Sequence, residues 1–253
     1  MMSPKVFISP STQQANLYAA QGTNEEIQMN LVADIICPRL TQHGVEWMRN
    51  NRHETFREAV IASNAYKPDL HVALHSNAGG TTARGLTIFC YKPVDHPAGT
   101  PAPRTGQQLA ENLYKYLEPL TPTEDRGIKD GSSSLSEVGD TTAPAVLIEY
   151  DFHDKVEGAQ WIYDHKDDLA EATVRGIVDQ LGIPYLPVSP VLDYQLMYTE
   201  LSIVHGELQE AYRKQGEDLQ VLVNAHVALQ KIVRDASVSV KTLIEFSNLT
   251  NYS

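Results

Sequence analysis

Two short apolar segments, each ending in a chemically active side chain, constrain the fold most. Residues 72–74 are apolar and run directly into His75, and residues 145–148 are apolar and run into Glu149. Short apolar runs bounded by turn signals are typical of buried strands. Because ligands in open α/β sheets bind at the carboxyl ends of strands, the two segments predict one shared site that contains His75 and Glu149.

Strand-like and helix-like segments alternate over the first ~185 residues. Strands are expected at 5–9, 45–48, 69–75, 86–91 and 143–149, and helices near 24–42, 55–65, 106–117 and 157–181. Residues 11–24 and 121–142 are expected to be long polar loops. This alternation predicts an α/β fold with a mainly parallel twisted sheet and helices on both faces.

The sequence pattern changes after a proline-rich stretch, from alternating strand-like and helix-like segments to a helical pattern alone. We predict a first domain at 1–183, a stiff linker at 184–191 and an α-helical segment at 192–253. Apolar residues in the last segment roughly follow a heptad. A coiled coil that makes a homo-oligomer and a helical hairpin folded at Gly216 both fit this pattern.

Composition excludes several classes of partner. The net charge is −12, so we expect no binding to nucleic acid or to an anionic membrane surface, both of which need basic patches. Cys37 and Cys90 are expected to be buried free thiols. The sequence shows no charged-then-apolar leader, so we expect no signal peptide and synthesis in the cytoplasm. No apolar run reaches the ~20 residues that span a bilayer.

Three acceptor groups are placed where a sheet could gather them. Glu25 begins a predicted helix, while His75 and Glu149 end predicted strands. A carboxylate, an imidazole and a water suit a hydrolytic Zn²⁺ site. The chain has no G-x-S-x-G elbow, and neither cysteine has an obvious basic neighbour, so nucleophilic hydrolysis is disfavoured. No P-loop or G-x-G-x-x-G supports nucleotide binding.

Five short motifs together resemble a known family. The first ~185 residues resemble the zinc-dependent N-acetylmuramoyl-L-alanine amidases of the type 3 group, which occur in bacterial autolysins and phage endolysins. The resemblance is carried by Asn24-Glu25, by Arg57 with Ala62-Ser63-Asn64, by Leu74-His75-Ser76-Asn77-Ala78, by Arg126-Gly127, and by residues 144–149.

The resemblance implies a function and a set of site residues. It implies hydrolysis of the amide between N-acetylmuramic acid and L-alanine in bacterial peptidoglycan. Glu25 and His75 would be Zn²⁺ ligands, and Glu149 would be the catalytic base. Substrate contacts are expected from Asn77, Arg57 and Arg126.

One position departs from the family pattern. Thr12 stands where the family has its first zinc-ligating histidine in D-P-G-H. Three explanations stay open. His153 could supply the third ligand, or two protein groups and waters could hold the metal. Alternatively, the domain could be an inactive wall-binding module with a multimerising tail. An active enzyme without a signal peptide would reach the wall by phage-type release or another export route.

Overall fold

The computed structural model describes residues 3–80, 83–91, 106–123, 125–187 and 229. The chain divides into two units, Met1–Leu186 and Pro187–Ser253. Apart from residue 229, the predicted helical segment 192–253 lies outside the described residues, so its coiled-coil and hairpin interpretations stay predictions. None of the helices in the described part of the chain is both long and apolar enough to cross a membrane.

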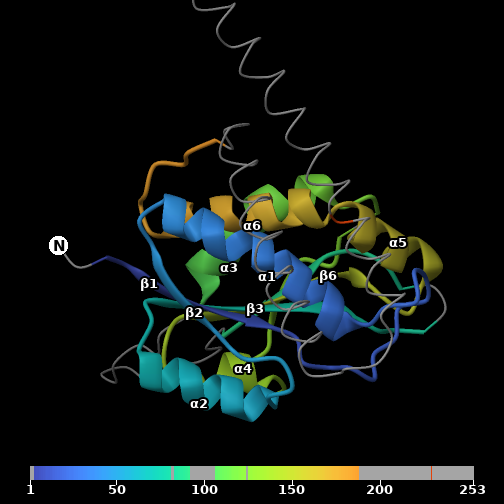
Figure 1. Cartoon of the computed structure of the whole chain (residues 1–253), viewed down its shortest axis with the longest axis horizontal. Helices are drawn as coiled ribbons and strands as arrows, with labels where there is room; N and C mark the ends of the chain where they lie inside the picture. Colours follow the sequence, from blue (N-terminus) through green and yellow to red (C-terminus); the bar gives the residue numbers. More distant parts are fainter. Residues whose placement is uncertain (1–2, 81–82, 92–105, 124, 188–228, 230–253) are drawn as a thin grey trace, which may run out of the picture. The chain divides into compact units, whose positions relative to one another are not determined.

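A six-stranded sheet forms the centre of the first unit (Figure 1). Its strand order is β2-β1-β3-β6-β4-β5. The strands are β1 (Lys5–Pro10), β2 (Glu46–Arg49), β3 (Leu70–Asn77), β4 (Thr87–Cys90), β5 (Ile128–Asp130) and β6 (Ala145–Phe152). Strands β2, β1, β3 and β6 are parallel, whereas β4 is antiparallel to β6. The predicted mainly parallel sheet is therefore confirmed.

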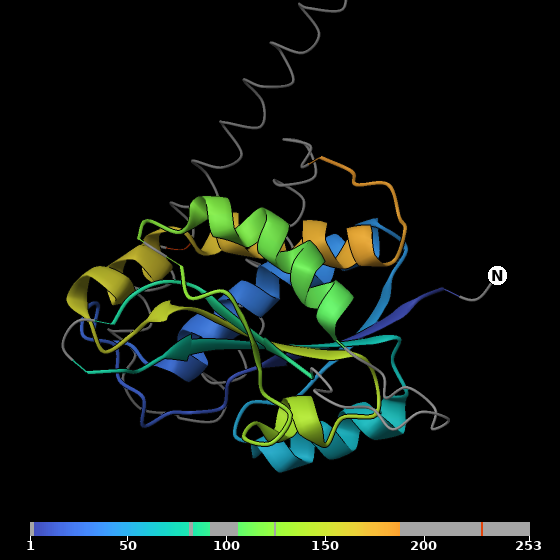
Figure 2. The same ribbon diagram turned by 180° about the vertical axis from the view of Figure 1, so that it is seen from behind.

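Helices cover both faces of the sheet, as predicted (Figures 1 and 2). Helices α1 (Glu25–Gln42), α3 (Gln107–Leu117) and α6 (Lys166–Gln180) cover one face. Helices α2 (Phe56–Tyr66) and α4 (Ser136–Gly139) cover the other. A 3₁₀ turn at Glu118–Leu120 follows α3, and α5 (Val156–Asp164) follows β6.

The alternation of side chains along β3 separates the core from the site. Leu70, Val72 and Leu74 are buried in the large core with α1, α3 and α6. The intervening side chains of a strand point to the opposite face. On that face Ala73 packs with Val138 of α4 and Leu147 of β6. His71 and His75 therefore lie on the side of the sheet that α2 and α4 cover.

Two segments differ from the sequence prediction. The expected loop 121–142 contains β5 and α4. The expected single helix 157–181 is divided into α5 and α6 at His165. There the His165 Nδ1 lies 2.9 Å from the Trp161 carbonyl oxygen, so the side chain caps the end of α5. Apolar periodicity reports neither the side-chain cap at His165 nor the pairing of β5 with β4.

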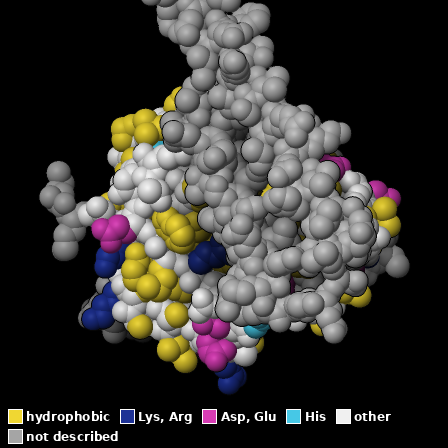
Figure 3. All heavy atoms as spheres, viewed as in Figure 1, with side chains coloured by type: hydrophobic (Ala, Val, Ile, Leu, Met, Phe, Trp, Pro, Cys, Tyr) yellow, Lys and Arg dark blue, Asp and Glu magenta, His cyan; other side chains and the backbone are white. Residues whose placement is uncertain are grey.

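Large hydrophobic side chains lie exposed on β2 and α2. Trp47 and Met48 on β2 and Phe56 and Ile61 on α2 are all exposed. Figure 3 shows hydrophobic side chains gathered on the described surface over this part of the unit. Apolar atoms contribute a large share of any folded protein's surface, so we assign this region no function.

Candidate functional site

The candidate site lies at the carboxyl ends of β1, β3 and β6. His75 and Glu149 are paired directly across β3 and β6, so their side chains share one face of the sheet. Glu25 is the first residue of α1, whose N-cap is Asn24. The predicted strand ends and helix start thus meet at one edge of the sheet.

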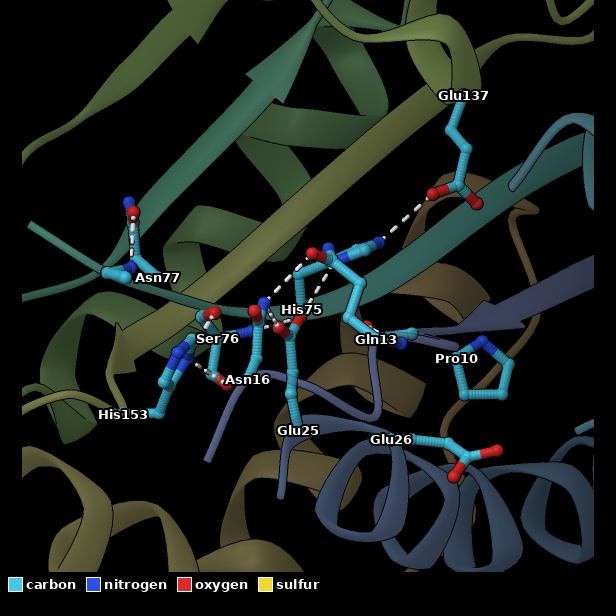
Figure 4. A network of polar contacts seen from close by, with 12 residues as sticks. Pro10, Gln13, Asn16, Glu25, Glu26, His75, Ser76, Asn77, Glu137 and His153 are labelled. Atoms are coloured by element: carbon cyan, nitrogen blue, oxygen red, sulfur yellow. Dashed lines mark hydrogen bonds and ion pairs between the residues drawn. The ribbon is translucent and has the colours of Figure 1, made fainter. Parts of the chain in front are cut away.

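His75 and Glu25 form the centre of the site (Figure 4). The His75 Nδ1 lies 2.8 Å from the Glu25 Oε1. The Ser76 backbone N–H donates to the same oxygen at 3.3 Å. The Asn16 side-chain amide donates to the other carboxylate oxygen of Glu25 at 2.5 Å. These bonds fix the Glu25 carboxylate against the imidazole, and both residues are buried.

The two partners stabilise each other's charged forms. Burial opposes charge on His75, but hydrogen bonds to Glu137 and Glu25 raise the pKa of His75 well above its usual value. Burial also opposes charge on Glu25, yet the His75 hydrogen bond lowers the pKa of that carboxyl. His75 therefore carries a positive charge between the carboxylates of Glu25 and Glu137.

Glu137 is a site residue that the sequence did not reveal. It lies on α4, and its Oε2 is 3.0 Å from the His75 Nε2. The Ser9 hydroxyl donates to its Oε1 at 2.5 Å. Burial opposes ionisation of this carboxyl, but His71, whose Nε2 lies 3.6 Å away, and the hydrogen-bonded His75 hold its pKa far below the usual range. His75 is thus held between two carboxylates, one at each ring nitrogen.

Glu149 is the carboxyl with the most unusual environment. Its Oε2 is buried and has no hydrogen-bond partner among the described residues. Burial raises the pKa of Glu149 to about 8, and the nearby Glu25 and Glu137 charges act in the same direction. The His75 charge opposes this shift. A carboxyl that changes charge near neutral pH is suited to proton transfer.

His153 is held by neighbours beside the central pair. Its Nδ1 lies 2.7 Å from the Ser76 carbonyl oxygen and 3.0 Å from the Ser76 hydroxyl. Its ring stacks on Tyr18, with centroids 5.5 Å apart. Within the described ranges, no set of three or more His, Cys, Asp or Glu side chains is gathered closely enough to hold a metal ion. The role of His153 as a metal ligand stays a prediction.

Gln13, the residue after Thr12, places its side-chain amide near His75. The Gln13 Nε2 lies 3.5 Å from the His75 Nδ1. The Asn16 amide donates to the Gln13 Oε1 at 2.9 Å, which links Gln13 to the Glu25 carboxylate. Thr12 itself is partly buried. The loop 11–24 therefore approaches the central pair with amide groups.

The three residues predicted to contact substrate lie on different elements of the fold. Asn77 ends β3, and its side chain accepts a hydrogen bond from the Ala78 backbone N–H at 2.8 Å. Arg57 is exposed on α2. Arg126 is exposed before β5, with its guanidinium carbon 5.3 Å from the Phe152 ring centroid. Their role in binding substrate stays a prediction.

The central pair fits a metal by the chemistry of its donors. A carboxylate only accepts hydrogen bonds, so the His75 Nε2 must donate to Glu137. In neutral His75 this leaves a lone pair on Nδ1, which faces the Glu25 oxygen. Two acceptors at that separation need a cation between them, either a proton or a metal ion. Imidazole and carboxylate are both zinc ligands.

The missed residues gave weak signals in the sequence. Gln13 and Asn16 belong to a polar loop, where amide side chains are ordinary turn residues. Glu137 lies in the segment 121–142 that we predicted as a polar loop, and only the neighbouring Leu135 and Val138 indicate that this segment packs on the sheet. Tertiary contacts, rather than local pattern, bring these residues to His75.

Comparisons with known proteins agree with this geometry. Residues 11–179 match the model of the type 3 amidase family, described as N-acetylmuramoyl-L-alanine amidase. The uncharacterised protein YqiI of Bacillus subtilis is 24% identical over 158 residues, which cover 60% of this chain and 72% of that protein.

Solved structures show the same fold. The catalytic domain of the N-acetylmuramoyl-L-alanine amidase CwlV from Bacillus (Paenibacillus) polymyxa var. colistinus superposes with a TM-score of 0.62 at 19% identity, covering 72% of this chain and 99% of that one. The amidase AmiC2 of Nostoc punctiforme gives 0.60 at 18% identity, covering 71% and 97%. Because the family model spans most of the first unit and the fold agrees, the chain belongs to the type 3 family of N-acetylmuramoyl-L-alanine amidases.

Proposed function

We propose that this chain hydrolyses the amide between N-acetylmuramic acid and L-alanine in peptidoglycan, with Zn²⁺ as its cofactor. Family membership supports an amidase activity on peptidoglycan. The observation that carries the finer proposal is the contact between His75 and Glu25 beside Glu149, whose pKa is raised to about 8.

In this proposal Glu25 and His75 hold the zinc ion. A bound zinc ion polarises the scissile carbonyl and acidifies water. The hydrogen bonds from Asn16 and from the Ser76 backbone hold the Glu25 carboxylate in place. Ordered ligands of this kind are what a preorganised site requires.

Glu149 is the proposed proton carrier. Its unpaired, buried Oε2 is available to accept a proton from water and to return it to the leaving amine. A cation bound beside it would lower its pKa and favour the carboxylate that starts the reaction. The carboxyl would therefore be ionised when the site is loaded.

His153 is the proposed third ligand. Its Nδ1 lies 2.7 Å from the Ser76 carbonyl oxygen, and a carbonyl only accepts hydrogen bonds. The proton must then sit on Nδ1, which leaves the lone pair on Nε2. Metal-ligating histidines commonly donate their other ring N–H to a backbone carbonyl in this way.

The proposal is tested on purified peptidoglycan with the wild-type chain and Glu149→Gln. The wild type should hold about one zinc per chain and release stem peptides with a free L-alanine amino group, detected by mass spectrometry. Glu149→Gln should bind zinc normally and lose about 10²- to 10⁴-fold in rate. The exposed Glu157→Gln variant is the control and should keep wild-type activity. Wild-type protein that is loaded with zinc but releases no peptide would contradict the proposal.

A second candidate function rests on Thr12. A hydroxyl is a poor substitute for a zinc-ligating histidine, so the domain could bind wall without cleaving it. The predicted helical segment 192–253 would then add avidity by multimerisation. Zinc-free protein that pellets with purified cell walls and releases nothing would favour this alternative.

A further inference from the structure

Glu137 is a buried carboxylate that three side chains from two strands surround. The Ser9 hydroxyl of β1 donates to its Oε1 at 2.5 Å, and the His75 Nε2 of β3 lies 3.0 Å from its Oε2. The His71 Nε2 lies 3.6 Å from its Oε1. Only 5% of Glu137 is exposed. A buried charge is costly unless it is paired and hydrogen-bonded, and here the Ser9 hydroxyl and the His75 Nε2 are the donors within hydrogen-bond distance.

The packing of α4 places this carboxylate on the sheet. Val138 of α4 packs with Ala73, which lies between His71 and His75 on the same face of β3. The small Ala73 side chain leaves room for the short helix. Gly139 allows α4 to pack closely on the segment before it, because a Cβ there would lie 2.2 Å from the Ser132 carbonyl oxygen. Glu137 is therefore placed beside His71 and His75 by the packing of Val138 on the sheet as well as by its hydrogen bonds to Ser9 and His75.

The contact with Glu137 determines which nitrogen of His75 can bind a ligand. The His75 Nε2 lies 3.0 Å from the Glu137 Oε2, and a carboxylate oxygen accepts hydrogen bonds, so Nε2 carries the proton of this contact. The opposite nitrogen, Nδ1, faces Glu25 at 2.8 Å. If the ring were turned or its proton moved, Nδ1 could not present a lone pair beside the Glu25 carboxylate.

We propose that Glu137 is a positioning residue that fixes His75 with Nε2 protonated and Nδ1 presented to the metal beside Glu25. This inference rests on the metal-dependent function proposed above. A carboxylate at the far nitrogen also makes an imidazole a more basic ligand. His71 supports the carboxylate from behind: its ring stacks on Phe7, with centroids 5.4 Å apart, and its Nδ1 lies 2.9 Å from the Ser63 hydroxyl.

The first test measures zinc affinity in Glu137→Gln, which keeps the shape and removes the charge. Competition against a chromophoric chelator should show a loss of about 10- to 100-fold, the usual effect of removing such a partner. Glu26→Gln is the matched control, because Glu26 is also a buried carboxylate but points away from His75 (Figure 4). It should bind zinc like the wild type. Equal affinities for Glu137→Gln and the wild type would overturn the proposal.

The second test uses the wild-type chain, so it does not depend on a variant that folds. Long-range ¹H–¹⁵N spectra of the zinc-loaded protein should show His75 protonated at Nε2 and bound at Nδ1. Protonation at Nδ1 would overturn the proposal whatever the variants do. Ser9→Ala, which removes a Glu137 partner without touching His75, should leave this signature unchanged.

The outcomes for Glu137 and for the proposed function are separable. A chain that needs Glu137 to bind zinc but releases no stem peptide would refute the amidase proposal and leave the role of Glu137 standing. A chain that hydrolyses peptidoglycan with zinc affinity independent of Glu137 would do the reverse.

Discussion

Glu149 carries a carboxyl whose protonation links the site to stability. Burial raises its pKa from the ordinary 4.5 to about 8. In zinc-free protein the folded state therefore keeps a proton that the unfolded chain loses between these two pH values. Because the folded state binds more protons in this window, stability falls as pH rises through it.

This linkage predicts the effect of Glu149→Gln in zinc-free protein. The neutral amide cannot ionise, so the variant should gain stability relative to the wild type as pH rises from 5 to 8. Urea unfolding at several pH values measures the difference in the free energy of unfolding. A difference that stays constant across this range would show that Glu149 titrates normally.

Substitutions of single residues can also identify the proposed third zinc ligand. His153→Ala should lower zinc affinity by at least about 10-fold, because it removes a proposed ligand. Gln13→Ala, which removes the amide 3.5 Å from the His75 Nδ1, should change affinity by less than about 3-fold. Chelator competition on both variants measures this. A larger loss of zinc affinity in Gln13→Ala than in His153→Ala would indicate that the Gln13 amide oxygen, and not His153, is the third ligand.

At the scale of elements, α1 and α6 are joined by an ion pair at the side of the core. The Arg39 guanidinium lies 3.1 Å from both carboxylate oxygens of Glu171, and it also donates to the Leu186 carbonyl at 2.7 Å. The Arg39 side chain is only 4% exposed. Removing Arg39 would leave the Glu171 carboxylate without its cationic partner.

Arg39→Ala should therefore destabilise the first unit by about 3 kcal/mol, in the range found when one member of a buried pair is removed. Thermal or chemical unfolding measures the change. Arg175→Ala is the control, because Arg175 is exposed on α6 and lies over the Tyr185 ring. Equal effects of the two substitutions would show that burial of the pair contributes nothing.

Elements with a strong apolar pattern could be predicted from the sequence, and those held by tertiary contacts could not. The strands ending near His75 and Glu149 were predicted within a few residues because they are continuous apolar runs. The short helix with Glu137 was missed because four residues cannot show a helical period. The end of α5 at His165 was missed because a side-chain cap interrupts the helix without proline or glycine.

The candidate site divides in the same way. Glu25, His75 and Glu149 were predicted together, since each begins or ends an element at one edge of the sheet. Gln13, Asn16 and Glu137 were not, because their approach to His75 depends on how two polar loops cross that edge. The sequence reports which residues end strands, but the path of a loop depends on contacts made elsewhere.

For the molecule as a whole, a zinc ion that binds only the folded state must stabilise it. At a free zinc concentration about 100 times the dissociation constant, the gain should be about 2.7 kcal/mol. Thermal unfolding with and without zinc measures it in the wild type. The gain should disappear in Glu25→Ala/His75→Ala, and a gain that persists there would indicate zinc bound elsewhere.

The pairing of β3 with β6 has a consequence for how the protein matures. His75 and Glu149 become neighbours only when β6, which begins at Ala145, joins a strand that ends at Asn77. A ribosome releases β3 long before β6, and closing such a long loop is a late event in folding. The nascent chain therefore cannot bring His75 and Glu149 together until β6 has been made, so this part of the site forms only after most of the first unit has been translated.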